Sequence, residues 1–133
     1  MAKPRIAFVC THNACRSQMA EAIANHLGSN IAAFLSAGTE IAECVDPLAK
    51  EAVCSLYGVE MDEDYRPKMI EEVLPLDLVV TMGCDVECPA VLSDKREDWK
   101  LADPTGGTIE MFEASAEEIY EHVSNLIERI KLG

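Results

Sequence analysis

Long apolar runs and positive charge are both scarce in this sequence. No segment of the 133 residues approaches the ~20 consecutive apolar residues of a membrane-spanning helix, and the first apolar run, Ile6 to Val9, is too short for a signal peptide. Lys and Arg number 11 against 24 Asp and Glu, which gives a formal net charge of -13. Nucleic acids and anionic membranes select basic surfaces, so neither is an expected partner. We expect a cytoplasmic protein.

Low-complexity tracts, internal repeats and linker-like stretches are missing as well. Hydrophobic residues make up 49% of the chain and charged residues 26%, a balance typical of chains that fold. A length of 133 residues is enough for one hydrophobic core and too short for two. The sequence therefore predicts a single domain over residues 1–133.

Paired metal-binding motifs are absent, although the chain contains six cysteines. Zinc sites use four ligands, commonly from two cysteine pairs, and Cys84 and Cys88 have neither a second pair nor a histidine nearby. In a cytoplasmic chain, cysteines are more typical of thiol chemistry or packing than of a disulfide framework. We expect no metal centre built from these cysteines.

Strand and helix patterns alternate along the chain. Short apolar runs typical of buried parallel strands occupy 5–10, 31–36 and 76–82, and a shorter, edge-like run occupies 97–104. Helical periodicity and capping residues predict helices over 17–27, 47–57, 66–75 and 114–132. This alternation predicts an α/β fold of three layers, α/β/α, with a central four-stranded parallel sheet, Rossmann-like in type.

The loop after the first strand carries the strongest chemical signal. Ligands of parallel sheets gather at the carboxyl ends of the strands, and here Cys10 ends the strand while Arg16 and Ser17 open the next helix. Unpaired N–H groups at a helix start form an anion site, and a guanidinium fork fits two oxygens of a tetrahedral oxyanion. The same donors favour a Cys10 thiolate, which is a nucleophile, and Ser17 can donate to the sulfur.

The spacing of Cys10, five residues, Arg16 and Ser17 resembles the CX5R(S/T) phosphate-binding loop of the low-molecular-weight protein tyrosine phosphatase superfamily. The stretch "CTHNACRSQMAEA" is similar to its arsenate reductase branch, although His12 stands where glycine is commoner. The resemblance runs from Arg5 to about Pro104 and implies the phosphatase-like fold. It implies oxyanion binding by the loop residues Thr11, His12, Asn13, Ala14, Cys15, Arg16 and Ser17. Asn13 is expected to brace the loop, because asparagine tolerates positive φ.

Cys84 and Cys88 follow the third predicted strand. Reduction of arsenate to arsenite takes two electrons, which a pair of thiols can supply, whereas a phosphatase needs no second thiol. By resemblance to thioredoxin-coupled arsenate reductases, Cys10 forms a thiol–arsenic adduct, Cys84 attacks Cys10 as arsenite departs, and Cys88 resolves the Cys10–Cys84 disulfide. Thioredoxin or another thiol reductant would then reduce the Cys84–Cys88 disulfide. A small thiol that resolves the adduct is the alternative to the Cys88 step.

Asp103 precedes Pro104 at the end of the fourth predicted strand. The resemblance implies a general acid at this place, which protonates the leaving oxygen and contributes ~10²–10⁴-fold. Asp-Pro is also a common start of a turn. Thr105, Gly106 and Gly107 follow where the phosphatases usually carry tyrosines, which favours a small inorganic oxyanion over an aryl phosphate.

Potassium is the one ion that the resemblance adds. Some relatives bind it beside the loop, and Asn13, Glu21 and Ser36 occupy positions similar to part of that site; no tightly bound cofactor is expected. The sequence predicts an arsenate reductase for arsenic detoxification, with the catalytic residues Cys10, Arg16, Ser17, Cys84, Cys88 and Asp103. Two alternatives stay open: a phosphatase with a Cys10 phosphoenzyme, and a non-catalytic oxyanion or redox sensor.

Overall fold

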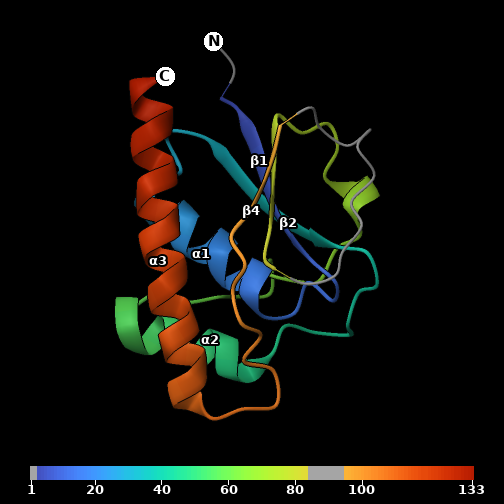
Figure 1. Cartoon of the computed structure of the whole chain (residues 1–133). Coiled ribbons are helices and arrows are strands. Elements are labelled where there is room, and N and C mark those ends of the chain that lie inside the picture. The colour runs from blue at the N-terminus through green and yellow to red at the C-terminus, as the bar shows by residue number, and fades with distance from the viewer. Residues whose placement is uncertain (1–2, 84–94) are drawn as a thin grey trace.

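The computed structural model describes residues 3–83 and 95–133 (Figure 1). Within these ranges the strands are β1 (Arg5–Cys10), β2 (Ala33–Gly38), β3 (Leu78–Thr81) and β4 (Arg96–Asp98). The helices are α1 (Arg16–Gly28), α2 (Pro47–Tyr57) and α3 (Ile109–Leu132), and a single 3₁₀ turn, η1, spans Ile70–Glu72. Cys84 and Cys88 lie outside the described residues.

The four strands form one fully parallel sheet in the order β2-β1-β3-β4. Cys10 at the end of β1 pairs with Gly38, and Val9 pairs with Thr81 of β3, so the strands end at a common edge. After β1 the chain turns first to β2 on one side and later to β3 on the other. This change of direction places a ligand crevice beside the ends of β1 and β3. The predicted four-stranded parallel sheet, with the fourth strand at its edge, is confirmed.

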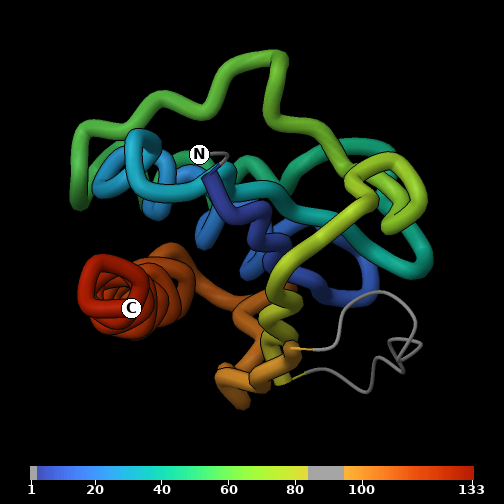
Figure 2. The backbone as a smooth tube through the Cα atoms, turned by 90° about the horizontal axis from the view of Figure 1, so that it is seen from above, coloured from blue at the N-terminus to red at the C-terminus, as the bar shows by residue number. Residues whose placement is uncertain are grey.

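The two faces of the sheet are covered unequally (Figures 1 and 2). The three helices pack together on the face that receives Ile6, Phe8 and Cys10. The other face receives Ala7 and Val9 and is covered by the segment around η1. Because β1 is buried on both faces from Ile6 to Cys10, its sequence over these residues is continuously apolar rather than alternating. This burial holds Cys10 rigidly at the end of the central strand.

Two helices differ from the sequence-based expectation. The helix expected over 66–75 is only the short turn η1, because the backbone of Lys68 binds the Asn13 side chain and the N–H of Gly38 instead of forming helical bonds, and Met69 is extended. Helix α3 begins at Ile109, five residues before the expected start, where the Thr108 side chain accepts a bond from the N–H of Met111. Among the described residues, no helix is both long and apolar enough to cross a membrane.

Candidate active site

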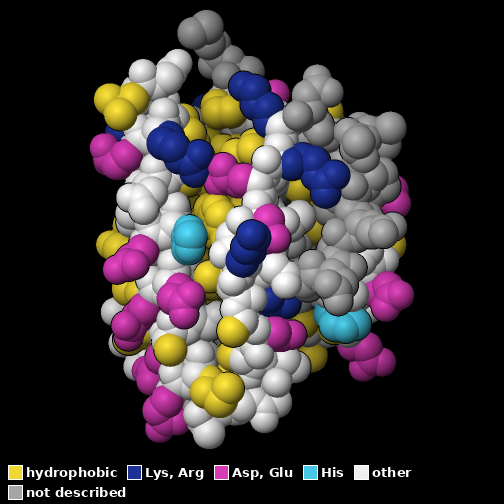
Figure 3. Space-filling model, in the orientation of Figure 1, with side chains coloured by type: hydrophobic (Ala, Val, Ile, Leu, Met, Phe, Trp, Pro, Cys, Tyr) yellow, Lys and Arg dark blue, Asp and Glu magenta, His cyan; other side chains and the backbone are white. Residues whose placement is uncertain are grey.

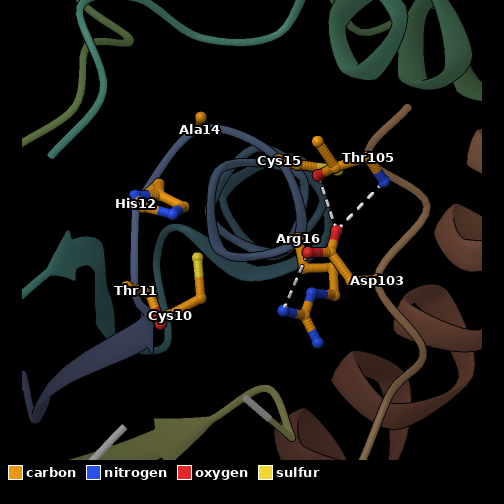
Figure 4. A pocket seen from close by; sticks show the side chains of 8 residues that line it. All are labelled: Cys10, Thr11, His12, Ala14, Cys15, Arg16, Asp103 and Thr105. Carbon is orange, nitrogen blue, oxygen red and sulfur yellow. Dashed lines mark hydrogen bonds and ion pairs between the residues drawn. The ribbon is translucent and has the colours of Figure 1, made fainter. Parts of the chain in front are cut away.

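Residues 11–15 connect β1 to α1 and wrap around the sulfur of Cys10 (Figure 4). Backbone N–H groups of the segment 39–46 bind the outer side of this loop, at 2.8–3.0 Å from the carbonyl oxygens of Thr11, His12 and Ala14. Within a trans peptide, the C=O and the following N–H point in opposite directions. The N–H groups that follow these carbonyls therefore point into the loop, where they form a cradle for an anion.

Gly38 allows the loop to lie against the end of β2. A Cβ atom at this position would lie 2.7 Å from the carbonyl oxygen of Thr11 and 3.0 Å from the Cβ of Asn13. The first of these contacts is with backbone, which cannot move without changing the loop. The absence of a side chain at Gly38 is thus a condition for the cradle.

Asn13 is completely buried and holds the loop from inside. Its φ of 52° lies in the left-handed region that asparagine tolerates. Its Nδ2 group donates to the Oγ of Ser17 at 2.8 Å, while its Oδ1 accepts from the backbone N–H of Lys68 at 2.7 Å and from Nε2 of Gln18 at 3.1 Å. One side chain therefore joins the loop to the start of α1 and to the segment before η1.

The sulfur of Cys10 lies 2.8 Å from the Oγ of Ser17. Since this Oγ already accepts a bond from Asn13, the serine proton is free to point at the sulfur. A hydroxyl directed in this way stabilises negative charge that develops on the sulfur during attack or departure. The structure thus places Cys10 and Ser17 together, as the roles of nucleophile and sulfur donor require.

Arg16 is fixed between the ends of two strands. Its Nη1 donates at 2.7 Å to the carbonyl oxygens of both Met82 and Leu101, and the residue is 5% exposed. Its Nη2 lies 3.6 Å from Oδ2 of Asp103. A guanidinium carries five N–H donors, and within residues 3–83 and 95–133 no hydrogen bond occupies Nε or Nη2, so their donors can bind a ligand. The fork is held in place before any oxyanion arrives.

Asp103 lines the cavity, and Thr105 orients its carboxylate (Figure 4). The Oδ1 atom accepts from the Thr105 hydroxyl at 2.6 Å and from the Thr105 backbone N–H at 3.0 Å. Partial burial opposes ionisation, but the two bonds from Thr105, with the charge of Arg16, hold the pKa of Asp103 below its ordinary value. Asp103 is therefore a carboxylate at neutral pH in the free site.

These groups surround a cavity of about 130 Å³, lined by Cys10, Thr11, His12, Ala14, Cys15, Arg16, Asp103 and Thr105. His12 lies at its rim, with Nδ1 3.0 Å from the carbonyl oxygen of Glu40. No Phe, Tyr or Trp is among the described residues that line it. A nucleophilic sulfur, a cationic fork, inward N–H groups and a carboxylate suit a small tetrahedral oxyanion and its protonation.

Cys15 contributes backbone to the cradle, and its thiol faces a different environment from that of Cys10. Burial, reinforced by the negative charges of Asp103 and Asp46, raises the pKa of the Cys15 thiol well above its usual range. A thiol kept protonated is a poor nucleophile. Cys84 and Cys88, the other predicted redox cysteines, lie outside the described residues.

The residues that the resemblance places beside a potassium ion bind one another and Lys68 in this structure. Ser36 donates its hydroxyl to Oε1 of Glu21 at 2.6 Å, and the ammonium group of Lys68 lies 3.5 Å from the same oxygen. The Oδ1 of Asn13 already accepts two hydrogen bonds. Across residues 3–83 and 95–133, no cluster of three or more His, Cys, Asp and Glu side chains could hold a metal ion.

A family model of the low molecular weight phosphotyrosine protein phosphatases matches residues 5–132. The chain belongs to this family. It is 35% identical over 130 residues to a glutaredoxin arsenate reductase of Synechocystis sp., covering 95% of this chain and 98% of that protein. The predicted phosphatase-like fold is confirmed by the solved structures that resemble it.

Two solved structures illustrate the likeness. One is an arsenate reductase in the phosphate binding state, with a TM-score of 0.86, 34% identity, and coverage of 96% of this chain and 98% of that chain. The other is a thioredoxin-dependent arsenate reductase of Corynebacterium glutamicum, with a TM-score of 0.77 and 31% identity. The second comparison covers 98% of this chain and 63% of that one.

Three residues that support the site were not identified in this role from the sequence. Thr105 orients Asp103, and an Asp-Pro-Thr stretch could have suggested it, because aspartate at the start of a turn often accepts a bond from two residues on. Gln18 donates to the backbone of Asn13 and of Arg66, and it resembles any polar residue of a helix. Lys68 lies far from the loop in sequence, and no local pattern marks it.

Proposed function

We propose that this protein reduces arsenate to arsenite with electrons from a thiol reductant. The observation that carries the proposal is the small cavity in which the sulfur of Cys10 lies beneath an anion cradle, next to the Arg16 fork. Arsenate is a tetrahedral oxyanion of the kind that such a cradle binds. Relatives that align along almost the whole chain are named arsenate reductases, which supports the same substrate.

In the first step, the sulfur of Cys10 attacks arsenic and one arsenate oxygen departs as water. Arg16 and the inward N–H groups hold the remaining oxygens, and Asp103, which lines the same cavity, transfers the proton that the departing oxygen needs. Arsenic stays in the +5 state in the resulting thiol–arsenic adduct. The Ser17 hydroxyl supports the sulfur, both as a nucleophile and later as a leaving group.

In the second step, the thiolate of Cys84 attacks the sulfur of Cys10. A sulfur–sulfur bond forms, and the electron pair of the sulfur–arsenic bond passes to arsenic, which leaves as arsenite. Two thiols are thereby oxidised while arsenic gains two electrons. Cys88 then attacks Cys84, which frees Cys10, and an external dithiol reduces the Cys84–Cys88 disulfide. This part of the proposal rests on the placement of both cysteines in the sequence and on the family.

Thioredoxin is the reductant that we propose, and the cytoplasm is the compartment, because cytoplasmic thiol pools keep such cysteines reduced. A thioredoxin-dependent relative supports this choice, while a relative named for glutaredoxin makes a small-thiol route the alternative. In either case the reaction serves arsenic detoxification.

The proposal is tested by coupling arsenate reduction to thioredoxin, thioredoxin reductase and NADPH. We expect arsenate-dependent NADPH loss for the wild type and none for Cys10→Ser, Cys84→Ser or Cys88→Ser. Turnover that survives in Cys88→Ser, with glutathione and glutaredoxin supplied, would replace the three-thiol relay by a small-thiol route. Cys54→Ser is the control, because Cys54 is an exposed thiol on α2.

Hydrolysis of p-nitrophenyl phosphate, measured on the same variants, separates a reductase from a phosphatase. A reductase hydrolyses this ester slowly, and only Cys10→Ser removes that activity, since the hydrolysis needs no second thiol. Rapid hydrolysis together with no arsenate-dependent NADPH loss would make the protein a phosphatase. Arsenate binding without either activity would make it a sensor.

A further inference from the structure

A charged pair lies behind the oxyanion loop and forms no part of the cavity lining. The side chains of Lys68 and Glu21 are 13% and 12% exposed, and Nζ of Lys68 lies 3.5 Å from Oε1 of Glu21. The ammonium also donates to the carbonyl oxygen of Arg66 at 3.0 Å, while Ser36 donates to the same Glu21 oxygen. Lysine and glutamate are seldom buried to this extent unless they are paired, so each of these two charges depends on the other for its burial.

The backbone of Lys68 is held as firmly as its side chain. Its N–H donates to Oδ1 of Asn13 at 2.7 Å, and its carbonyl oxygen accepts from the N–H of Gly38 at 2.8 Å. The ammonium, which binds Glu21 on α1, is thus the third attachment of this residue. Lys68 therefore connects the loop, the end of β2 and helix α1.

A continuous series of hydrogen bonds leads from Lys68 to the sulfur. The Lys68 N–H binds Asn13, the Asn13 amide binds Ser17 at 2.8 Å, and Ser17 lies 2.8 Å from the sulfur of Cys10. Asn13 and Ser17 are completely buried. In an interior without water such bonds are stronger and polarise one another, so a displacement of Lys68 is transmitted to the sulfur.

The negative charge of Glu21 affects the oxyanion loop as well as the hydrogen bonds that lead from Lys68 to the sulfur. Glu21 lies one helical turn after Ser17 on α1, so its carboxylate is behind a loop that must hold an anion. An unpaired carboxylate in this partly buried position would repel both a bound oxyanion and a charged sulfur. The Lys68 ammonium cancels that charge from within the chain, in the place where the resemblance suggested potassium.

We propose that Lys68 is a positioning residue of the oxyanion site, whose ammonium neutralises Glu21 and whose backbone N–H orients Asn13, in place of a bound metal cation. Its part in arsenate turnover rests on the proposed function. Its effect on the loop does not, because Cys10 reactivity and phosphate binding can be measured without turnover. Failure of this inference is therefore distinguishable from failure of the proposed function.

The test is the rate at which iodoacetamide alkylates Cys10 in Lys68→Met, followed by peptide mass spectrometry. We expect alkylation to slow about fivefold, and the phosphate concentration that half-protects Cys10 to rise about tenfold, because the Glu21 charge is no longer balanced. Lys131→Met is the matched control, since Lys131 forms an ion pair with Glu128 on the exposed side of α3, away from the oxyanion loop. Wild-type values in Lys68→Met would overturn the inference.

Two further variants separate charge from packing. Lys68→Arg should keep phosphate protection within about threefold of wild type, because it keeps the cation. The double variant Lys68→Met/Glu21→Gln should recover to within about twofold, since no unpaired charge is left. If Lys68→Met does not fold, the double variant carries the test: weak phosphate protection in a folded double variant, shown by its near-ultraviolet circular dichroism, would overturn the inference.

Potassium provides an independent readout. We expect wild-type alkylation and phosphate protection to be the same in potassium and sodium chloride, because Lys68 supplies the cation. In Lys68→Ala, potassium or methylammonium should restore part of the protection, since either cation can enter the space beside Glu21. A wild-type protein that needs potassium for phosphate protection would overturn the inference in favour of a bound ion.

Discussion

At the scale of single residues, Asp103 is ionised in the free site, whereas its proposed role as a general acid requires its protonated form. Partial burial opposes ionisation, but the two bonds from Thr105 and the charge of Arg16 together hold the pKa of Asp103 below its ordinary value. A general acid has to be protonated when the leaving oxygen departs. The proton must therefore be brought by a protonated oxyanion, or Asp103 must take it up from an acidic medium.

We predict that Thr105→Val moves the alkaline decline of kcat/KM for arsenate to higher pH. The substitution removes the 2.6 Å donor, so the charged form of Asp103 is less stable and its pKa rises. The protonated acid then persists to higher pH. The pH profile of kcat/KM in the coupled assay measures the shift.

Asp103→Asn is the control for this profile. It should lose the same alkaline decline and should lower kcat/KM by about 10²–10⁴-fold at its optimum. A Thr105→Val profile that coincides with the wild type would show that Asp103 does not transfer the proton.

At the scale of secondary-structure elements, the cradle depends on how closely β2 approaches the loop. Gly38→Ala would bring a Cβ to 2.7 Å from the backbone oxygen of Thr11, so we predict that the loop shifts and that kcat/KM falls about 10²-fold. Phosphate protection of Cys10 should weaken in parallel, which isothermal titration with phosphate can confirm.

Gly28→Ala is the matched control for that substitution. The added Cβ there would meet Ile127, but at the tip of a flexible side chain, and α1 ends far from the cavity. Near-normal phosphate affinity in Gly38→Ala would show that the loop adjusts without loss of the cradle.

Elements with local signals could be predicted from the sequence, and elements fixed by distant contacts could not. Helix α2 spans 47–57 as predicted, and its Asp46 cap, its Pro47 at the first position and Gly58 at its end are signals that lie next to one another in the sequence. Strand β1 was equally predictable from the sequence, because both of its faces are buried from Ile6 to Cys10 and these residues are therefore apolar. By contrast, the 3₁₀ turn at Ile70–Glu72 packs where a longer helix was expected.

The same division applies to the site. Cys10, Arg16 and Ser17 lie at the two ends of one short loop, so their spacing in the sequence reflects their spacing in the structure. Asn13 and Asp103 were identified with the help of the family pattern. The bond from Lys68 to Asn13 spans 55 residues, and such a bond depends on the folding of the whole chain rather than on any local stretch.

At the scale of the whole molecule, an anion must approach a protein with a formal net charge of -13. Acidic side chains gather along the side formed by α3, with fewer Lys and Arg on the face shown (Figure 3). The cradle is a local positive site within a negative field, which disfavours the encounter with arsenate.

We predict that sodium chloride lowers the KM for arsenate about twofold between ~0.01 M and ~0.15 M, as the Debye length falls from about 30 Å to about 8 Å. Screening weakens the long-range repulsion more than the short contacts within the cradle. Steady-state kinetics in chloride measures the effect. Sodium sulfate is the contrasting salt, because sulfate also competes for the cradle and should raise the KM instead.

The outward anchoring of the loop carbonyls has a consequence for selectivity. A cradle that is already formed before an anion binds recognises the shape and charge of that anion, and phosphate shares both with arsenate. Abundant cellular phosphate must therefore enter and leave this pocket continually. Thiols do not take phosphorus from the +5 to the +3 state, whereas arsenic accepts the electron pair readily. Discrimination between arsenate and phosphate thus occurs after binding, at the redox step, and the pocket itself need not distinguish the two anions.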